Sequence, residues 1–162
     1  MPLLLSLVLA CGSQDGGQGP LEGRLGTGEW EWEALENGDE VPVILGPQGG
    51  HHLLSSVRVS GLEAGDSDNI SDENNPTTSF YVWVDGVNLT PGARYIQGLD
   101  PIDDTVDPYT HEMVGRFAIL DIEDDDELDG VELTFEVVVE DVEGNQVSDL
   151  LELVAYPHPY ND

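Results

Sequence analysis

The sequence predicts an all-β protein, an antiparallel two-sheet β-sandwich of about eight strands. Apolar residues recur at every second position through most of the chain, whereas the i, i+3, i+4 stripes of amphipathic helices are missing. Clusters of Gly, Pro, Asn and Asp separate the alternating segments and are typical of turns. Short strands separated by such turns, with no helical segment, favour a sandwich or a small barrel.

The alternation places the strands in chain order. At the first of them, Trp30, Trp32 and Ala34 alternate with glutamates, which predicts a strand with both tryptophan rings packed in the core. Five further segments have the same character. These strands are expected at residues 41–45, 53–60, 79–84, 93–97 and 113–122.

Residues 79–84 carry large apolar side chains on both faces of the expected strand. Phe80, Val82 and Val84 alternate with Tyr81 and Trp83, and only one of the two sets can face a single core. The other set is either covered by a loop or forms an interaction patch. If their faces were exposed, the aromatic residues of this strand and of the first strand would suit a carbohydrate-binding platform.

Residues 131–156 predict a β-hairpin, because alternation on both sides flanks the turn residues Glu143-Gly144-Asn145. Within it, the stretch 135–149 contains Val-Val-Val-Glu-Asp-Val-Glu-Gly-Asn at positions 137–145. This stretch resembles the last two strands of bacterial immunoglobulin-like modules, which commonly read V-x-V-x-D-x-x-G-N there. The resemblance implies an immunoglobulin-like sandwich and no particular function.

The N-terminal segment indicates where the protein is located. Residues 3–10 are apolar except for one serine and end at Cys11, the only cysteine of the chain. Eight residues span at most ~12 Å as a helix, too short for a ~30 Å hydrocarbon core, so the segment fits the h-region of a signal peptide. No Lys or Arg precedes it, as a secretory n-region requires, and we therefore expect the true start codon to lie further upstream.

The run Val-Leu-Ala-Cys at positions 8–11 resembles the lipobox of bacterial lipoproteins. The resemblance implies cleavage before Cys11 and a membrane anchor through lipid on that cysteine. With Gly12 in place of aspartate, it also implies an outer-membrane or cell-surface location in the cell envelope. The expected organisation is a signal peptide (1–10), a lipidated Gly-rich tether (11–27) and one sandwich domain (28–162).

Composition excludes one class of partner. The chain has 34 acidic residues, four arginines and no lysine, and its formal net charge is -30. Such a charge repels the phosphates that nucleic-acid-binding proteins must neutralise, so DNA and RNA are excluded. A protein or a glycan remains as the expected partner. One cysteine cannot form an internal disulfide, so the core must be stable without one.

Two groups of residues are candidate metal ligands. His51 or His52 together with His111 and Met113 could bind copper or zinc if the starts of their two strands were neighbours. Only one of the two adjacent histidines could take part, because neighbouring strand residues point to opposite faces. Carboxylates suit calcium, and a loose calcium site is a second candidate, whose alternative is a solvated acidic turn. Its candidate ligands are Asp121, Asp124, Asp126 and Asp129.

The sequence contains no nucleophile, base and orienting residue in a recognisable catalytic pattern, so we expect a protein that is not an enzyme. The leading hypothesis is a lipid-anchored β-sandwich of the cell envelope that acts as a binding, adhesion or structural module with an unknown ligand. The alternative is an envelope lipoprotein that handles copper or zinc through the histidines and Met113.

Overall fold

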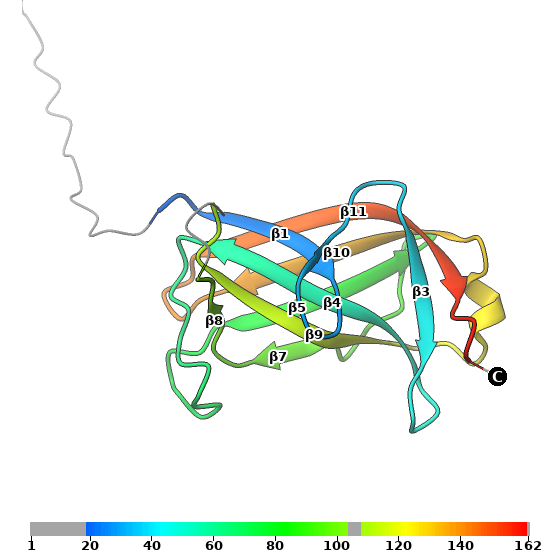
Figure 1. Ribbon diagram of the computed structural model, residues 1–162, viewed down its shortest axis with the longest axis horizontal. Helices are drawn as coiled ribbons and strands as arrows, with labels where there is room; N and C mark the ends of the chain where they lie inside the picture. Colours follow the sequence, from blue (N-terminus) through cyan, green and yellow to red (C-terminus); the bar gives the residue numbers. More distant parts are fainter. Residues whose placement is uncertain (1–18, 104–107, 162) are drawn as a thin grey trace, which may run out of the picture.

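The structure is a computed structural model that describes residues 19–103 and 108–161, and across these ranges the fold is all-β, as predicted (Figure 1). The described residues form eleven strands and one short 3-10 helix. These elements are β1 (Glu22–Thr27), β2 (Glu33–Ala34), β3 (Glu40–Leu45), β4 (His51–Ser60), β5 (Thr77–Val84), β6 (Val87–Asn88), β7 (Arg94–Ile96), β8 (Asp100–Pro101), β9 (His111–Leu120), η1 (Asp125–Leu128), β10 (Glu132–Glu140) and β11 (Gln146–Pro157).

The strands pair in two groups that β3 joins. In the β4 group, β4 pairs with β1 and β9, while β2 extends β1 and β8 extends β9. In the β10 group, β10 pairs with β11 and β5, and β6 and β7 extend β5. The first part of β3 runs parallel to β11, and its last two residues pair antiparallel with β4. Every other pairing is antiparallel, and Figure 1 shows β4 and β9 crossing in front of β5 and β10.

One hydrophobic core is built from the alternate residues of both groups. On β10, Leu133, Phe135, Val137 and Val139 are at most 3% exposed, so the predicted alternation of this strand is confirmed. Side chains from β4, β5 and β9 complete the same cluster. They include Leu53, Val57, Val59, Phe80, Val82, Met113, Ala118 and Leu120. On β5, β10 and β11 the other face is partly or fully exposed, whereas β4 is buried along most of both faces.

Residues 22–27, which the sequence assigned to the tether, form β1. Leu25 is 0% exposed, and its backbone N–H donates to Asp149 Oδ2 at 2.8 Å. Gly23 and Gly26 carry no side chain, so the alternation of apolar and polar residues that predicts a strand is not visible in this segment. A Cβ on Gly23 would lie 3.0 Å from Val147, and one on Gly26 would lie 2.2 Å from the Trp32 ring nitrogen. The close packing of β1 against Val147 and Trp32 thus requires glycine at both positions, and the same glycines make the strand hard to recognise from the sequence.

The prediction of a strand at residues 30–34 is wrong for most of that segment. Only its last two residues pair, as β2, and Trp30 is 87% exposed. Gly28 adopts a φ of 104°, which turns the chain, and its carbonyl accepts a hydrogen bond from Ser56 Oγ at 3.3 Å. The segment therefore runs along the outer side of β4. Trp32 is only partly buried there and does not enter the core.

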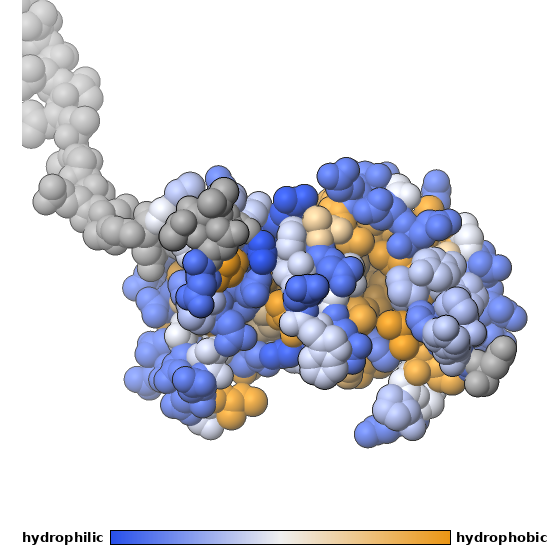
Figure 2. Space-filling model, in the orientation of Figure 1, coloured by the Kyte–Doolittle hydropathy of each residue, from blue (hydrophilic) through white to orange (hydrophobic). Residues whose placement is uncertain are grey.

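The surface of the β4 group combines charge with a small apolar area. Figure 2 shows hydrophilic residues over most of the visible face, with hydrophobic ones gathered toward the end where β3 and β4 meet. The exposed large apolar side chains there are Leu45, Phe117 and Ile119, at 39%, 45% and 58%. Phe117 packs against the ring of His52, with ring centroids 4.3 Å apart.

The β10–β11 hairpin forms as predicted, and Asp141 holds its turn together. The carboxylate of Asp141 accepts hydrogen bonds from the backbone N–H groups of Glu63, Glu143 and Asn145 at 3.1, 3.0 and 2.9 Å, and from Asn145 Nδ2 at 3.0 Å. The residue is 4% exposed. Burial raises the pKa of Asp141, but these hydrogen bonds outweigh it and hold the pKa below its ordinary value. One carboxylate thus joins the hairpin to the loop that follows β4.

Candidate functional site

The predicted copper or zinc site is not assembled. His51 and His52 pair with residues at the end of β9, whereas His111 pairs with Val59 near the opposite end of β4. Because the strands are antiparallel, their starts are separated by nearly the whole length of β4, roughly 26 Å at about 3.3 Å per residue. Met113 is 1% exposed within the hydrophobic core. The prediction that His51 or His52, His111 and Met113 share a metal is therefore wrong.

The histidines are instead packed into the fold. Burial lowers the pKa of His52 below its ordinary value of 6.5, and neighbouring His51 lowers it further. Burial also lowers the pKa of His111, and the nearby carboxylate of Glu63 offsets part of that shift. The neutral imidazole is favoured at both positions, as expected for side chains that pack rather than carry charge.

The predicted calcium ligands are brought together only in part. The carboxylates of residues 124–126 offer oxygen atoms within 4.8 Å of one another. Asp124 Oδ1 accepts from the backbone N–H of Asp126 at 3.1 Å, and Glu127 Oε1 accepts from the backbone N–H of Asp124 at 3.0 Å. These contacts form a capping box at the start of η1, which explains the acidic residues without an ion. The other two expected ligands, Asp121 and Asp129, lie outside this group.

Cys11 lies outside the described residues, so its lipidation stays a prediction. Within the described part of the chain, no helix combines the length and the apolar character needed to cross a bilayer. The described chain enters β1 at one end of the molecule, and the C-terminus lies at the other end, near η1 (Figure 1). Close to the entry point, Ser60 Oγ donates to the carbonyl of Pro20 at 2.9 Å.

The outer face of the β10 group carries the two aromatic residues that the sequence left unassigned. Phe80 and Val82 are 0% exposed in the core, so Tyr81 and Trp83 point outward and are partly exposed. Their ring centroids are 6.2 Å apart, with an interplanar angle of 32°. These two rings therefore form an aromatic surface on the outer side of β5, away from the hydrophobic core.

Cross-strand register places carboxylates beside this aromatic surface. Tyr81 lies opposite Glu136, which lies opposite Leu150, while Trp83 lies opposite Thr134, which lies opposite Glu152. Directly opposed residues have Cβ atoms about 4.5–5.5 Å apart, so each row is a line of side chains in contact. We call this surface the β10 face. Its members are Tyr81, Trp83, Glu132, Thr134, Glu136, Leu150 and Glu152.

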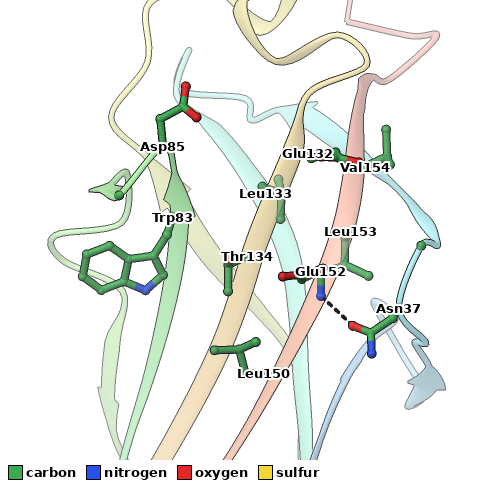
Figure 3. Close-up of a pocket in the computed structure, with 12 residues that line it drawn as sticks. Asn37, Trp83, Asp85, Glu132, Leu133, Thr134, Leu150, Glu152, Leu153 and Val154 are labelled. Atoms are coloured by element: carbon green, nitrogen blue, oxygen red, sulfur yellow. Dashed lines mark hydrogen bonds between the residues drawn. The ribbon is translucent and has the colours of Figure 1, made fainter.

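A groove of about 670 Å³ crosses the β10 face. Figure 3 shows the Trp83 ring on one side of β10 and Asn37 on the far side of β11, with Thr134 and Glu152 between them. The Asn37 side chain is held in place because its Oδ1 accepts from the backbone N–H of Glu152 at 2.8 Å. Asp85, in the turn after β5, lines one end of the groove. The arrangement can contact a ligand through ring faces and carboxylates together.

Comparisons with protein-family models, with curated proteins and with solved structures found no match to this chain. Function is therefore inferred from the residues and their geometry. Sequence reasoning had noted Tyr81 and Trp83 as a potential patch, but it had assigned no role to Asn37 or to the outward residues of β10 and β11. Alternation alone indicated that Thr134 and Glu136 point outward, and only strand pairing places them beside the rings.

Proposed function

We propose that the protein is a lipid-anchored protein of the cell envelope whose immunoglobulin-like β-sandwich acts as a non-catalytic binding or adhesion module. The observation that carries the binding role is the β10 face. The side chains of Tyr81 and Trp83 point away from a core that is already filled, and Trp83 lines a groove. Aromatic residues are enriched at protein interfaces, where they supply much of the binding energy.

The order of the strands supports the immunoglobulin-like part of the proposal. In such domains, one sheet has the order A-B-E-D and the other includes C, F and G. Here β1, β4, β9 and β8 are neighbours in that order in one group, and β5, β10 and β11 are neighbours in the other. The pairing of β3 with both groups and the β10–β11 hairpin agree with the same arrangement.

The anchoring part of the proposal is supported by the sequence before β1. Cys11 closes an apolar segment, and the residues between it and β1 include four glycines. Membrane surfaces are commonly anionic, so they repel a domain with a net charge of -30, and a tether that keeps the domain away from the surface suits such a charge.

The position of the groove is compatible with an anchored module. Gly23 in β1 packs against Val147 near the start of β11, so these two strand starts lie at the same end of the domain. From there β11 runs away from the start of β1, and the groove residues 150–154 follow along it. The groove therefore lies away from the end of the domain at which β1 begins.

Replacing Cys11 with serine is expected to move the protein from the membrane pellet to the soluble fraction, because the only site for lipid attachment is lost. The measurement is fractionation of cells that express each form, followed by immunoblotting. Ser13→Ala, which changes the same segment without touching the cysteine, should stay in the pellet. Persistence of Cys11→Ser in the pellet after a high-salt wash would refute lipid anchoring.

A further inference from the structure

We infer that the β10 face binds a basic segment of a partner protein, with arginine or lysine side chains of that segment over Tyr81 and Trp83 and beside Glu136 and Glu152. This inference rests on the proposed binding function and adds the chemistry of the partner. It is carried by a comparison between two surfaces of the same molecule.

The first surface contains a complete aromatic, cation and carboxylate arrangement. The guanidinium carbon of Arg58 lies 4.5 Å from the centroid of the Trp32 ring, and Arg58 Nε donates to Glu112 Oε2 at 2.8 Å. Arg24 lies over the same ring at 5.3 Å. Elsewhere, Arg116 lies 6.0 Å from the ring of Tyr95. Three of the four arginines of the chain thus contact an aromatic ring, as cation–π attraction favours.

The β10 face has the aromatic and the carboxylate parts of this arrangement without a cation. No cation–π contact within the described ranges involves Tyr81 or Trp83. None of the residues of β5, β10 and β11 is basic. Arg94, on the neighbouring strand β7, pairs with Ser79, which is two residues from Tyr81 and four from Trp83 along β5. Within the described ranges, its guanidinium makes no cation–π contact with either ring. A cation from outside the chain would complete the set.

Charge decides between the classes of ligand that aromatic rings can contact. Glu132, Glu136 and Glu152 project from the face, and Asp85 lies at the end of the groove. With a net charge of -30, the protein repels anionic ligands and attracts cationic ones over long distances. A neutral glycan would stack on the rings but would gain nothing from this charge. The carboxylates therefore favour a basic partner.

The spacing of the two rows indicates an extended protein segment. The row of Tyr81 and Glu136 and the row of Trp83, Thr134 and Glu152 are two strand residues apart, which is about 6.7 Å. An extended chain that runs alongside the strands presents its side chains i and i+2 at the same interval. The groove of about 670 Å³ lies at the row of Trp83, Thr134 and Glu152, whereas Tyr81 and Glu136 lie outside its lining. Of two basic residues at alternate positions of the partner, one would therefore enter the groove and the other would lie on the neighbouring row.

The test uses a fluorescently labelled synthetic peptide of alternating arginine and serine. Its affinity for the full-length protein in detergent is measured by fluorescence anisotropy at two salt concentrations. We expect Trp83→Ala to weaken binding about tenfold and Glu152→Gln about fivefold, because each removes one part of the arrangement. The same peptide with citrulline, which is neutral and has almost the shape of arginine, should not bind. Melting temperatures of the variants would show that the fold is intact, since both side chains point outward.

Two matched controls separate this surface from general attraction by an acidic protein. Trp30→Ala removes an exposed ring, and Glu73→Gln removes an exposed charge, both outside the β10 face. Each should change affinity less than twofold. Equal losses in the controls, equal binding of the citrulline peptide, or binding of cellohexaose that Trp83→Ala abolishes would each overturn the inference. None of these results would alter the Cys11→Ser fractionation, so the two proposals fail separately.

Discussion

Replacing Phe135 with alanine is expected to lower the free energy of unfolding by about 3–5 kcal/mol, the usual cost of deleting a buried aromatic ring. Phe135 is 0% exposed, and its ring centroid lies 6.2 Å from that of Phe80, which is equally buried. Its neighbours across the strands are Val82 on β5 and Leu151 on β11. The deletion would therefore leave a cavity between the three strands that carry the β10 face.

Urea denaturation followed by intrinsic fluorescence measures this loss. Trp30→Ala is a suitable control, because it also removes an aromatic ring but from a position that is 87% exposed. It should change stability by no more than about 0.5 kcal/mol. A loss below about 1 kcal/mol for Phe135→Ala would contradict a closed core at this position.

Replacing Asp141 with alanine is expected to lower the free energy of unfolding by about 2–4 kcal/mol, because several donors lose a charged acceptor at once. The backbone N–H groups of Glu63, Glu143 and Asn145 all donate to this carboxylate. The residue is 4% exposed, so water replaces these hydrogen bonds poorly. Glu143→Gln, an exposed change of charge in the same turn, should have little effect on stability.

The loss at Asp141 should also depend on pH. Its pKa is lowered in the folded protein, so the stabilisation is present above the ordinary carboxyl value of about 3.8 and is lost as pH falls through the folded-state pKa. Urea denaturation of both forms at successive pH values measures the difference. The gap between wild type and Asp141→Ala should be constant near neutrality and should narrow in acid below pH 3.8. A gap that does not change with pH would show that the charge of this carboxylate contributes nothing.

The sequence predicted best those strands in which apolar residues face the core and polar residues face solvent. β10 and β11 are the clearest, because their inward residues are apolar and most of their outward residues are polar. The sequence did not predict β1, because Gly23 and Gly26 interrupt its alternation of apolar and polar side chains. Both glycines are needed where other segments of the same chain approach closely. Residues 30–34 were misread because Trp32 packs on Arg24 and Arg58, so an apolar alternation there reflects cation–π contacts on the surface.

The candidate site could be predicted only in fragments. Tyr81 and Trp83 were recognised as one of two possible outward sets, but the sequence could not choose between that set and Phe80 with Val82. The choice depends on which side of β5 the β4 group packs. Thr134 and Glu152 lie opposite each other in the predicted hairpin, but Asn37 and Trp83 come from segments far from it in the chain, and their place beside the hairpin depends on tertiary contacts. The prediction of a shared histidine site was wrong for a related reason. It required the starts of β4 and β9 to be neighbours, whereas antiparallel pairing places them at opposite ends of the two strands.

Intact-mass spectrometry of the protein extracted from the cell envelope with detergent tests the proposed lipid anchor most directly. We expect a mature chain that begins at Cys11, lacks residues 1–10 and carries acyl chains on that cysteine. A chain that retains residues 1–10 and a free thiol at Cys11 would contradict the proposal that this domain is held at a membrane by lipid.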